Sequence, residues 1–345
     1  MSPSRLASAA LAGALALLLL PLPLAAADVE PAPIGVVDLH VDLSYETNYK
    51  GHSFDHGVGQ YVASEIQAGG VAGLVLPLYI PRNVSPTGPR MQDLETSYQN
   101  VFDLLTRTPP YTLPGCRPAK GRVRTWLSFE NANPLAADPP AVTRWVARGV
   151  RLFGLVHSYN NDLATSSGSG HHEKQGLTAK GRDVAKRVIA AGGVLDVSHA
   201  SDAATRDMID LSLSRGVPVV ASHSDARALA NNPRNLTDAQ IRDIGRSGGV
   251  IGVNFHSPFL AVGRRATLRD VVRHVQHLVK VAGIDHVAIG SDFEGGIRPP
   301  RALGSAAQFH VLASALLKAG FGRDEVSKVF HENALRVLCR GQDGS

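Results

Sequence analysis

The chain alternates between short apolar runs and longer segments with helical spacing. Eight runs rich in Val, Ile and Leu recur along it, and their continuous apolar character is typical of strands that are buried on both faces. These predicted strands span residues 35–43, 71–80, 124–131, 150–158, 193–199, 218–224, 249–255 and 286–292. Between them, helical spacing predicts helices over residues 93–107, 178–191, 202–215, 237–247 and 268–282.

Eight strand-then-helix units predict an α/β fold. We expect a (β/α)8 barrel of the TIM type, with two extra C-terminal helices, 305–319 and 323–338, packed outside it. A doubly wound open sheet is the alternative, because an apolar pattern does not determine whether the sheet closes. Residues 81–92 and 163–176 are expected to be long loops.

Polar residues collect where the predicted strands end. The set comprises His40, Asp42, Glu130, His157, His199, His223 and Asp292. In a parallel barrel the carboxyl ends of the strands form one face, where active sites are assembled from several strands. The sequence therefore predicts that these side chains converge at one functional site.

The residue types at these ends indicate a metal centre. His40 and Asp42 are two residues apart, so in an extended strand both side chains point to the same face. The candidate ligands are His40, Asp42, Glu130, His199 and His223. Imidazole and carboxylate ligands without thiolate suit zinc, manganese, iron or nickel, and the secreted location predicted below makes zinc the default. Five such ligands suffice for two ions if one carboxylate bridges. Two such ions would share a hydroxide suited to the hydrolysis of an amide.

The first 27 residues have the pattern of a secretory signal. Arg5 precedes an apolar core that ends near Ala25-Ala26-Ala27, which predicts cleavage before Asp28 and a secreted or periplasmic protein. A membrane-spanning anchor is the alternative, but prolines interrupt the run and leave it short for a bilayer. We expect residues 28–345 to form a single barrel domain.

The net charge and the cysteine content limit the kinds of partner and metal site that the chain can have. The net charge of +5 is spread along the chain, so a nucleic-acid interface is not expected. Cys116 and Cys339 are the only cysteines, which excludes a Cys-rich zinc module, while their pairing with each other stays open. His171-His172 lies among Gly and Ser and is expected to belong to a solvated loop rather than to a metal site.

Five motifs resemble those of the membrane (renal) dipeptidases, the zinc peptidase family M19. They are Asp38-Leu39-His40-Val41-Asp42-Leu43, Asp196-Val197-Ser198-His199, Val220-Ala221-Ser222-His223-Ser224, Pro233-Arg234-Asn235 and Gly290-Ser291-Asp292-Phe293. The similarity extends from about residue 34 to residue 338. It implies a metal-dependent hydrolase barrel that cleaves the peptide bond of dipeptides.

The resemblance also implies a role for each site residue. His40 and Asp42 would hold one zinc ion, His199 and His223 the second, and Glu130 would bridge them. Among the remaining residues, His157 would polarise the scissile carbonyl, Arg234 would bind the substrate's carboxylate, and Asp292 would exchange a proton with the nucleophile and the leaving amine. A homodimer is expected from the same resemblance.

This chain departs from the family pattern in three places. Leu39 and Val41 stand where glycine and often asparagine occur, Asn131-Ala132-Asn133 replaces two glycines after Glu130, and His256 follows Asn254-Phe255 where tyrosine is usual. Other functions also stay open: an amidohydrolase acting on a cyclic amide or lactone, a zinc-binding barrel without turnover, and a metal-free structural barrel.

Overall fold

The computed structural model describes residues 34–52, 59–117, 120–169 and 175–341. These residues belong to one compact unit, Pro33–Ser345. The expected signal, residues 1–27, and the His171-His172 pair lie outside the described residues. Within the described ranges, no helix combines the length and the apolar character that a membrane span requires.

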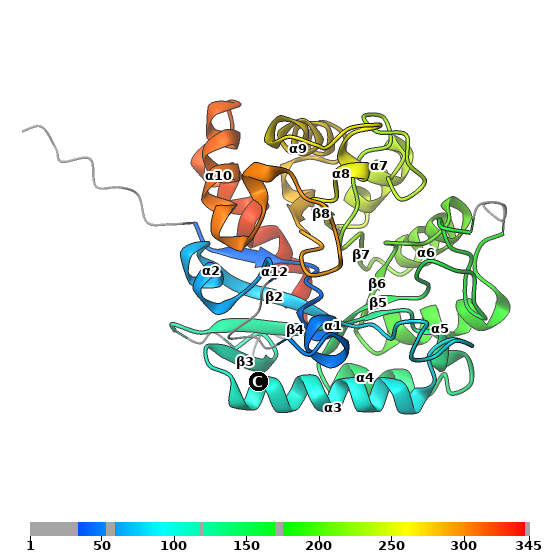
Figure 1. Ribbon diagram of the computed structural model, residues 1–345. Helices are drawn as coiled ribbons and strands as arrows, with labels where there is room; N and C mark the ends of the chain where they lie inside the picture. The colour runs from blue at the N-terminus through cyan, green and yellow to red at the C-terminus, as the bar shows by residue number, and fades with distance from the viewer. Residues whose placement is uncertain (1–33, 53–58, 118–119, 170–174, 342–345) are drawn as a thin grey trace, which may run out of the picture. The chain divides into compact units, whose positions relative to one another are not determined.

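A ring of parallel strands forms the centre of the fold (Figure 1). All eight predicted strands are present, most of them shorter than expected: β1 (Val36–Asp38), β2 (Val71–Leu78), β4 (Val123–Glu130), β5 (Val150–Gly154), β6 (Val194–Asp196), β7 (Val219–Val220), β8 (Ile251–Val253) and β9 (Val287–Ile289). They are hydrogen-bonded in the order β7-β6-β5-β4-β2-β1-β9-β8. A short strand that was not predicted, β3 (Tyr111–Pro114), pairs with β4 outside this path.

A single bridge joins the two ends of this path. Ala221 pairs in parallel with Ile251, the Ala221 N–H donates to the Val250 carbonyl at 3.1 Å, and the Gly252 N–H donates to the Ala221 carbonyl at 2.8 Å. Because Ala221 follows β7 and Ile251 begins β8, these bonds close the sheet. The barrel prediction is confirmed, and the open doubly wound sheet is wrong.

Helices surround the strands (Figure 1). Their bounds are α1 (Leu43–Tyr49), α2 (Ala63–Ala68), α3 (Met91–Arg107), α4 (Ala141–Ala147), α5 (Ala179–Ala190), α6 (Asp202–Ser214), α7 (Asp238–Arg246), α8 (Ser257–Leu260), α9 (Leu268–Ala282), α10 (Phe309–Lys318), α11 (Arg323–Ser327) and α12 (Asn333–Leu338). Short 3-10 turns occupy Asn133–Ala136, Ile284–His286, Arg301–Leu303 and Ala306–Gln308. Thr178, the first residue of the predicted helix, caps α5, since its side chain accepts a hydrogen bond from the Gly181 N–H at 3.0 Å.

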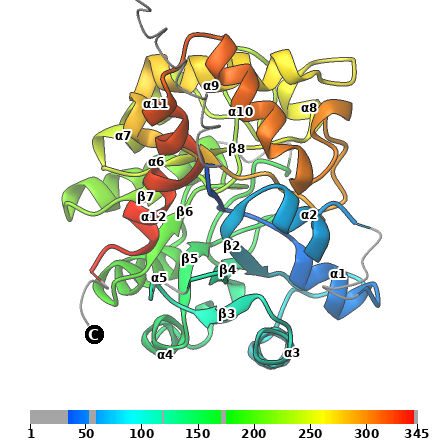
Figure 2. The same ribbon diagram turned by 90° about the vertical axis from the view of Figure 1, so that its left-hand side faces the viewer.

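The last predicted helix is divided. A π-helical turn, Lys328–Glu332, separates α11 from α12, so residues 323–338 form three short segments instead of one helix. α12 contributes Ala334, Val337 and Leu338 to a buried cluster that also takes apolar residues from the strands of the ring, among them Val37 and Trp126. Figure 2 shows α12, in red, next to the strands.

Polar contacts place α12 at the amino ends of the strands. Asn333 Nδ2 donates to the carbonyls of Ile284 and Val287 at 2.8 and 2.9 Å, and Arg336 Nη1 donates to the Gly248 carbonyl at 2.6 Å. Gly248 precedes β8, and Ile284 precedes β9. Helix α12 therefore covers the amino-terminal mouth of the barrel and leaves the carboxyl ends for the site.

A disulfide joins Cys116 to Cys339. The sequence left this pairing open because it could not give the distance between the two residues, which is 5.6 Å between their α-carbons. Cys116 follows β3 and Cys339 follows α12 directly. The bond therefore fastens the helix that covers the amino-terminal mouth.

Candidate metal centre

The first two predicted ligands follow a strand that is shorter than expected. β1 ends at Asp38, and Asp42 is the residue directly before α1, so His40 and Asp42 do not lie together in an extended strand as the sequence suggested. Val41 makes only an isolated bridge with Phe293. The two side chains nevertheless converge, with His40 Nε2 at 3.4 Å from Asp42 Oδ2.

Glu130, the last residue of β4, lies at the centre of the site. Its Oε1 atom lies within 3.7 Å of the Nε2 atoms of four histidines: His199 at 3.0 Å, His40 at 3.5 Å, and His157 and His223 at 3.7 Å. Glu130 itself is buried. Residues that lie far apart in the sequence are therefore brought around one carboxylate oxygen.

Three overlapping triads in the described part of the chain have the geometry to hold metal ions. They are His40, Glu130 and His223; Glu130, His157 and His199; and His40, Asp42 and Asp292. In each triad the potential ligand atoms lie within 4.8 Å of one another. All the predicted ligands occur in these triads, together with His157 and Asp292, which the resemblance assigns to catalysis instead.

Two buried nitrogen atoms at this centre have no hydrogen-bond partner among the described residues, which fits a bound cation. Both ring nitrogens of His40 are buried without a hydrogen bond among the described residues. His199 Nε2 and His223 Nε2 lie 2.9 Å apart. Since Ser222 Oγ contacts His223 Nδ1 at 2.8 Å, the Nε2 atom of His223 is the one directed at the cluster. Imidazole and carboxylate donors in this arrangement suit zinc-type ions.

Gly295 leaves room above two of the carboxylates. A Cβ atom at this position would lie 2.5 Å from Asp42 Oδ2 and 2.9 Å from Asp292 Oδ1. Any other residue would push against these oxygens, so glycine keeps both of them accessible from the cavity. This space is a second observation that fits a metal centre.

The electrostatics of the cluster show an excess of buried carboxylates. Burial would lower the pKa of His40, but Glu130 and Asp42 beside it raise this pKa to about 10. Burial raises the pKa of Glu130 well above its usual value, with His40 opposing the shift. Burial and then Asp42 raise the pKa of Asp292 to about 7. Bound cations would relieve this crowding of negative charge.

The other imidazoles are held in the neutral form. Burial, followed by the positive charge of Arg234, lowers the pKa of His157 to about 3. The same two causes lower the pKa of His199 well below its usual value. For His223, burial is again the largest cause, followed by His40. Neutral imidazole is the form that binds a metal or stabilises a polarised oxygen without carrying its own charge.

Arg234 is a cation that forms no ion pair with another described residue. It follows β7, its N–H donates to Asn232 Oδ1 at 2.9 Å, and its guanidinium lies 5.4 Å from the centre of the Phe259 ring. No carboxylate among the described residues lies within salt-bridge distance of it. Burial lowers the pKa of the guanidinium. Arg234 is thus a cation available to an anionic ligand.

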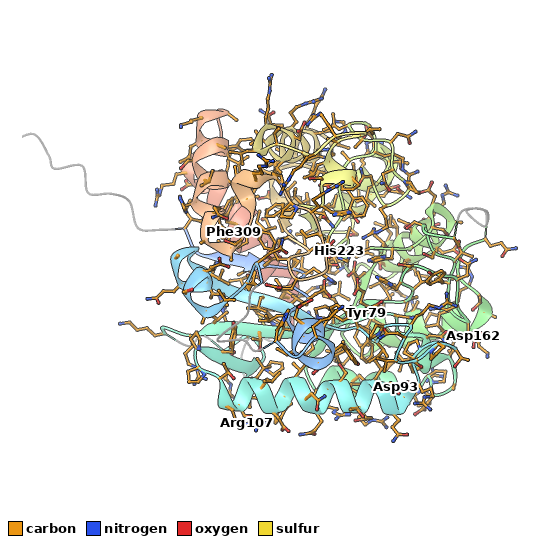
Figure 3. The ribbon with its side chains drawn as sticks, viewed as in Figure 1. Tyr79, Asp93, Arg107, Asp162, His223 and Phe309 are labelled. Atoms are coloured by element: carbon orange, nitrogen blue, oxygen red, sulfur yellow. A yellow bond between two sulfur atoms is a disulfide. The ribbon has the colours of Figure 1, made fainter. Side chains whose placement is uncertain are left out.

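A cavity of about 280 Å³ connects these groups. It is lined by Asp42, Tyr45, Tyr79, Glu130, His157, His199, Arg234, His256, Phe259, Asp292, Gly295, Gly296 and Ile297. Figure 3 shows His223 and Tyr79 near the middle of the molecule, among the side chains of the strands and their loops. Three of the candidate ligands, Asp42, Glu130 and His199, therefore line the same small space as the Arg234 guanidinium.

The backbone is strained at this site. His199 and Asp292 have φ values of 68° and 63°, and Asn131, directly after Glu130, has φ of 128°. Residues other than glycine rarely adopt such angles, and they persist where the surrounding structure enforces them. The strain is therefore concentrated at three strand ends that build the cluster.

Two buried aspartates, which belong to the motifs quoted above but were given no role, hold these strand ends together. Asp38 Oδ1 accepts hydrogen bonds from the N–H groups of His40 at 3.2 Å and Ser291 at 2.9 Å. Asp196 Oδ1 accepts from the Ser222 N–H at 3.0 Å. The first joins the end of β1 to the end of β9, and the second joins β6 to β7. An aspartate two or three residues before a strand-end histidine was the available signal.

A closed α/β barrel with histidines and carboxylates at the carboxyl ends of its strands is the architecture of metal-dependent hydrolases. The family model for membrane dipeptidase, peptidase family M19, matches residues 31–343. The chain therefore belongs to this metallodipeptidase family.

Individual relatives agree with this assignment. A dipeptidase of Claviceps purpurea, tcpJ, is 32% identical over 228 residues, covering 65% of this chain and 52% of that protein, so the match spans about half of its length. An uncharacterised protein of Klebsiella pneumoniae, from the pqqA 5′ region, is 41% identical over 218 residues, 61% of this chain and 79% of that protein.

A solved structure adds a liganded comparison. It is a metallopeptidase of Rhodobacter sphaeroides bound to a phosphinate mimic of the dipeptide L-Ala-D-Ala. The two chains are 26% identical, with a TM-score of 0.78, and the match covers 89% of this chain and 99% of the other. The similarity therefore extends over the whole barrel.

Proposed function

We propose that the protein is a zinc dipeptidase that hydrolyses the bond between two amino acids with a bridging hydroxide at a binuclear site. The observation that carries this proposal is the position of Glu130 Oε1, within 3.7 Å of four imidazole nitrogens in a cavity that also contains the unpaired Arg234. The dipeptide mimic bound to the Rhodobacter sphaeroides metallopeptidase supports the same substrate class.

The proposed zinc ligands are divided between two ions. His40 and Asp42 would hold one, His199 and His223 the other, and Glu130 would bridge them. Two bound zinc ions would supply an activated water and polarise the scissile carbonyl. The unpartnered ring nitrogens of His40 and the 2.9 Å approach of His199 Nε2 to His223 Nε2 support this set.

Arg234 would bind the carboxylate at the C-terminal end of the substrate. A planar guanidinium presents two parallel N–H groups to a carboxylate, and this one is bound to no acidic side chain among the described residues. A substrate needs a free carboxyl end to use it. Selection for short peptides follows, and this favours a dipeptide over a cyclic amide or lactone.

His157 and Asp292 would act on the reacting bond itself. Neutral His157 lines the cavity and would stabilise the oxygen on which negative charge develops. Asp292 would take a proton from the attacking water and pass it to the departing amine. Its pKa, raised to about 7, suits a group that both accepts and donates a proton near neutral pH.

We further propose export and a dimeric assembly for the protein. Export follows from the signal pattern in residues 1–27. Mass spectrometry of the mature protein should identify Asp28 as its first residue. The disulfide between Cys116 and Cys339 supports an oxidising compartment. Light scattering of the purified protein would test the dimer.

The main experiment measures zinc and turnover on the same preparation. We expect two zinc ions per chain, hydrolysis of simple dipeptides, and loss of this activity with a chelator. Dipeptides amidated at the C-terminus should be poor substrates because they cannot pair with Arg234. Turnover of a cyclic amide or lactone in preference to any dipeptide would contradict the proposal.

A further inference from the structure

A second cavity adjoins the metal cavity. It has a volume of about 530 Å³ and shares Tyr79 and His157 with its neighbour. Its other lining residues come from the loop between β2 and α3, which the sequence predicted, and from the segments that follow β4 and β5. The catalytic roles proposed above use none of these other residues.

Three asparagines that line this cavity present donors. Asn131 Oδ1 accepts from the Asn133 N–H at 3.2 Å, and Asn133 Oδ1 accepts from the Asp162 N–H at 3.0 Å. Asn160 Oδ1 accepts from the Ser166 N–H at 2.8 Å. Because a backbone N–H can only donate, these bonds fix each amide oxygen toward the protein. The amide nitrogens of Asn131, Asn133 and Asn160 have no partner among the described residues.

The guanidinium of Arg82 also lines this cavity. Arg82 lies with its guanidinium 4.1 Å from the centre of the Tyr159 ring, an arrangement that holds the charge in place. Asp162 is the acidic residue of the lining; it is exposed, and Figure 3 shows it near the edge of the molecule. Amide N–H groups and a guanidinium together favour an oxygen-rich, negatively charged group.

The order of the strands indicates which end of a bound dipeptide faces the second cavity. In the path β7-β6-β5-β4-β2, the strand β2 is four positions from β7 in a ring of eight, which places the two strands on opposite sides of the barrel. Arg234 follows β7, and Tyr79 follows β2 directly. A dipeptide whose carboxylate lies on Arg234 therefore extends its amino-terminal residue toward Tyr79 and the second cavity.

We infer that the protein prefers dipeptides whose amino-terminal residue has an acidic side chain, which the asparagine amides and Arg82 bind in the second cavity. The inference rests on the proposed function, because it takes the carboxylate on Arg234 as the fixed end. It adds a substrate class that the metal cavity alone does not select.

The test compares substrates that differ only in the first residue. The zinc-loaded enzyme is assayed with Glu-Ala, Gln-Ala, Lys-Ala and Ala-Ala. We expect kcat/KM for Glu-Ala to exceed that for Lys-Ala and Gln-Ala by about tenfold or more, the effect of hydrogen bonds to a charged group. Equal values for Glu-Ala and Lys-Ala would overturn the inference.

Two variants test whether residues of the second cavity cause the preference for Glu-Ala. Asn133→Asp keeps the acceptor for the Asp162 N–H but replaces the free donor with an oxygen, so the ratio of kcat/KM for Glu-Ala to that for Ala-Ala should fall by about tenfold. Arg82→Gln, at an exposed side chain, should lower the same ratio. Asn83→Asp, in the same loop but outside the lining, is the matched control and should keep the ratio of the wild type.

The outcomes separate this inference from the proposed function. If Ala-Ala is hydrolysed but Glu-Ala is not preferred, or if Asn133→Asp and Arg82→Gln leave the ratio at the control value, the acidic subsite is wrong and the dipeptidase stands. If the zinc-loaded enzyme hydrolyses none of the four dipeptides, the dipeptidase and the subsite both fail.

Discussion

Asn254 holds Asp292 by a hydrogen bond of 3.0 Å from its Nδ2 atom to Asp292 Oδ2. Asn254 is fully buried, and its Oδ1 accepts from the His256 N–H at 2.6 Å. The backbone donor fixes which end of the amide faces Asp292. The carboxylate proposed to move the proton is therefore oriented by a residue that does not itself line the metal cavity.

Replacement of Asn254 should slow turnover without removing zinc. Asn254→Asp keeps the acceptor for the His256 N–H but puts an oxygen opposite Asp292, so we expect kcat to fall about tenfold or more with little change in KM. Asp292→Asn alone should lower kcat by about 10² to 10⁴. In the Asp292→Asn background, Asn254→Asp should not lower kcat any further. Steady-state kinetics with zinc analysis measures this, and equal losses in both backgrounds would contradict the positioning role.

Removal of the central carboxylate should empty the metal site. Glu130→Ala takes away the oxygen that lies within 3.7 Å of four imidazole nitrogens, so bound zinc should fall from about two ions per chain to fewer than one. Elemental analysis after gel filtration gives the stoichiometry. Glu332→Ala, at an exposed glutamate, is the control that should keep both ions; a Glu130→Ala protein with full zinc would show that this residue is no ligand.

Loss of the Arg234 charge should act on substrate binding. With Arg234→Gln we expect KM for a free dipeptide to rise by about ten- to a hundredfold, because a charge-assisted pair is lost. The weak activity on the amidated dipeptide should change little. Arg298→Gln is a fitting control, since Arg298 is exposed and does not line the cavity. An equal loss on free and amidated substrates would speak for a structural role instead.

Asp270 should make the stability of the fold depend on pH. Its carboxylate accepts from Arg264 Nη1 and Nη2 at 2.7 Å and from the Thr267 N–H at 2.8 Å, and Arg264, the largest cause, holds the pKa of Asp270 well below its usual range. A lowered pKa in the folded state gives stability that is fully present above about pH 4, the unfolded value, and is lost as pH falls further.

The corresponding measurement is urea unfolding of the wild type and Asp270→Asn at two pH values. At pH 6 the substitution should lower the free energy of unfolding by about 1 to 2 kcal/mol, the usual effect of losing a charged helix cap. At pH 3 the difference should shrink, because Asp270 is by then mostly protonated in the unfolded chain, and this uptake of protons stabilises the unfolded wild type relative to the folded protein. A difference that is the same at both pH values would count against this reasoning.

The disulfide should stabilise the closed barrel. Cys116 and Cys339 are separated by 223 residues in the sequence, so their bond restricts a long loop of the unfolded chain. The double substitution Cys116→Ser and Cys339→Ser should lower the free energy of unfolding by about 2 to 5 kcal/mol. Thiol titration of the unfolded wild type should find no free thiol. Two titratable thiols in the purified wild type would show that the bond does not form.

The long elements of the fold could be predicted from the sequence. The periodicity placed α9 at Leu268–Ala282 with the observed bounds, because fifteen residues cover about four helical turns and give a clear apolar stripe. Elements such as α1 and β3, of seven and four residues, are too short for such a pattern. The bridge between Ala221 and Ile251 consists of backbone hydrogen bonds, which do not require particular side chains. Closure of the sheet could therefore not be predicted from residue types.

The sequence predicted which residues form the site, but it did not predict the contacts between them or the backbone conformation around them. Residues at strand ends could be assigned because parallel strands present their carboxyl ends on one face. The contact of Asn254 with Asp292 joins residues 38 positions apart, and the bond that orients the Asn133 amide joins residues 29 positions apart. Neither contact follows from the local sequence pattern around these residues. The expected extended strand through His40 and Asp42 was wrong in detail, since β1 ends at Asp38 and a helix begins after Asp42.

Helix α12 supplies Ala334, Val337 and Leu338 to the packing inside the ring, and it follows all the strands of the ring in the sequence. A nascent chain on the ribosome cannot complete this packing until α12 has emerged. A product that stops before α12 would leave the amino-terminal mouth of the barrel open to water, and it should be degraded rather than accumulate.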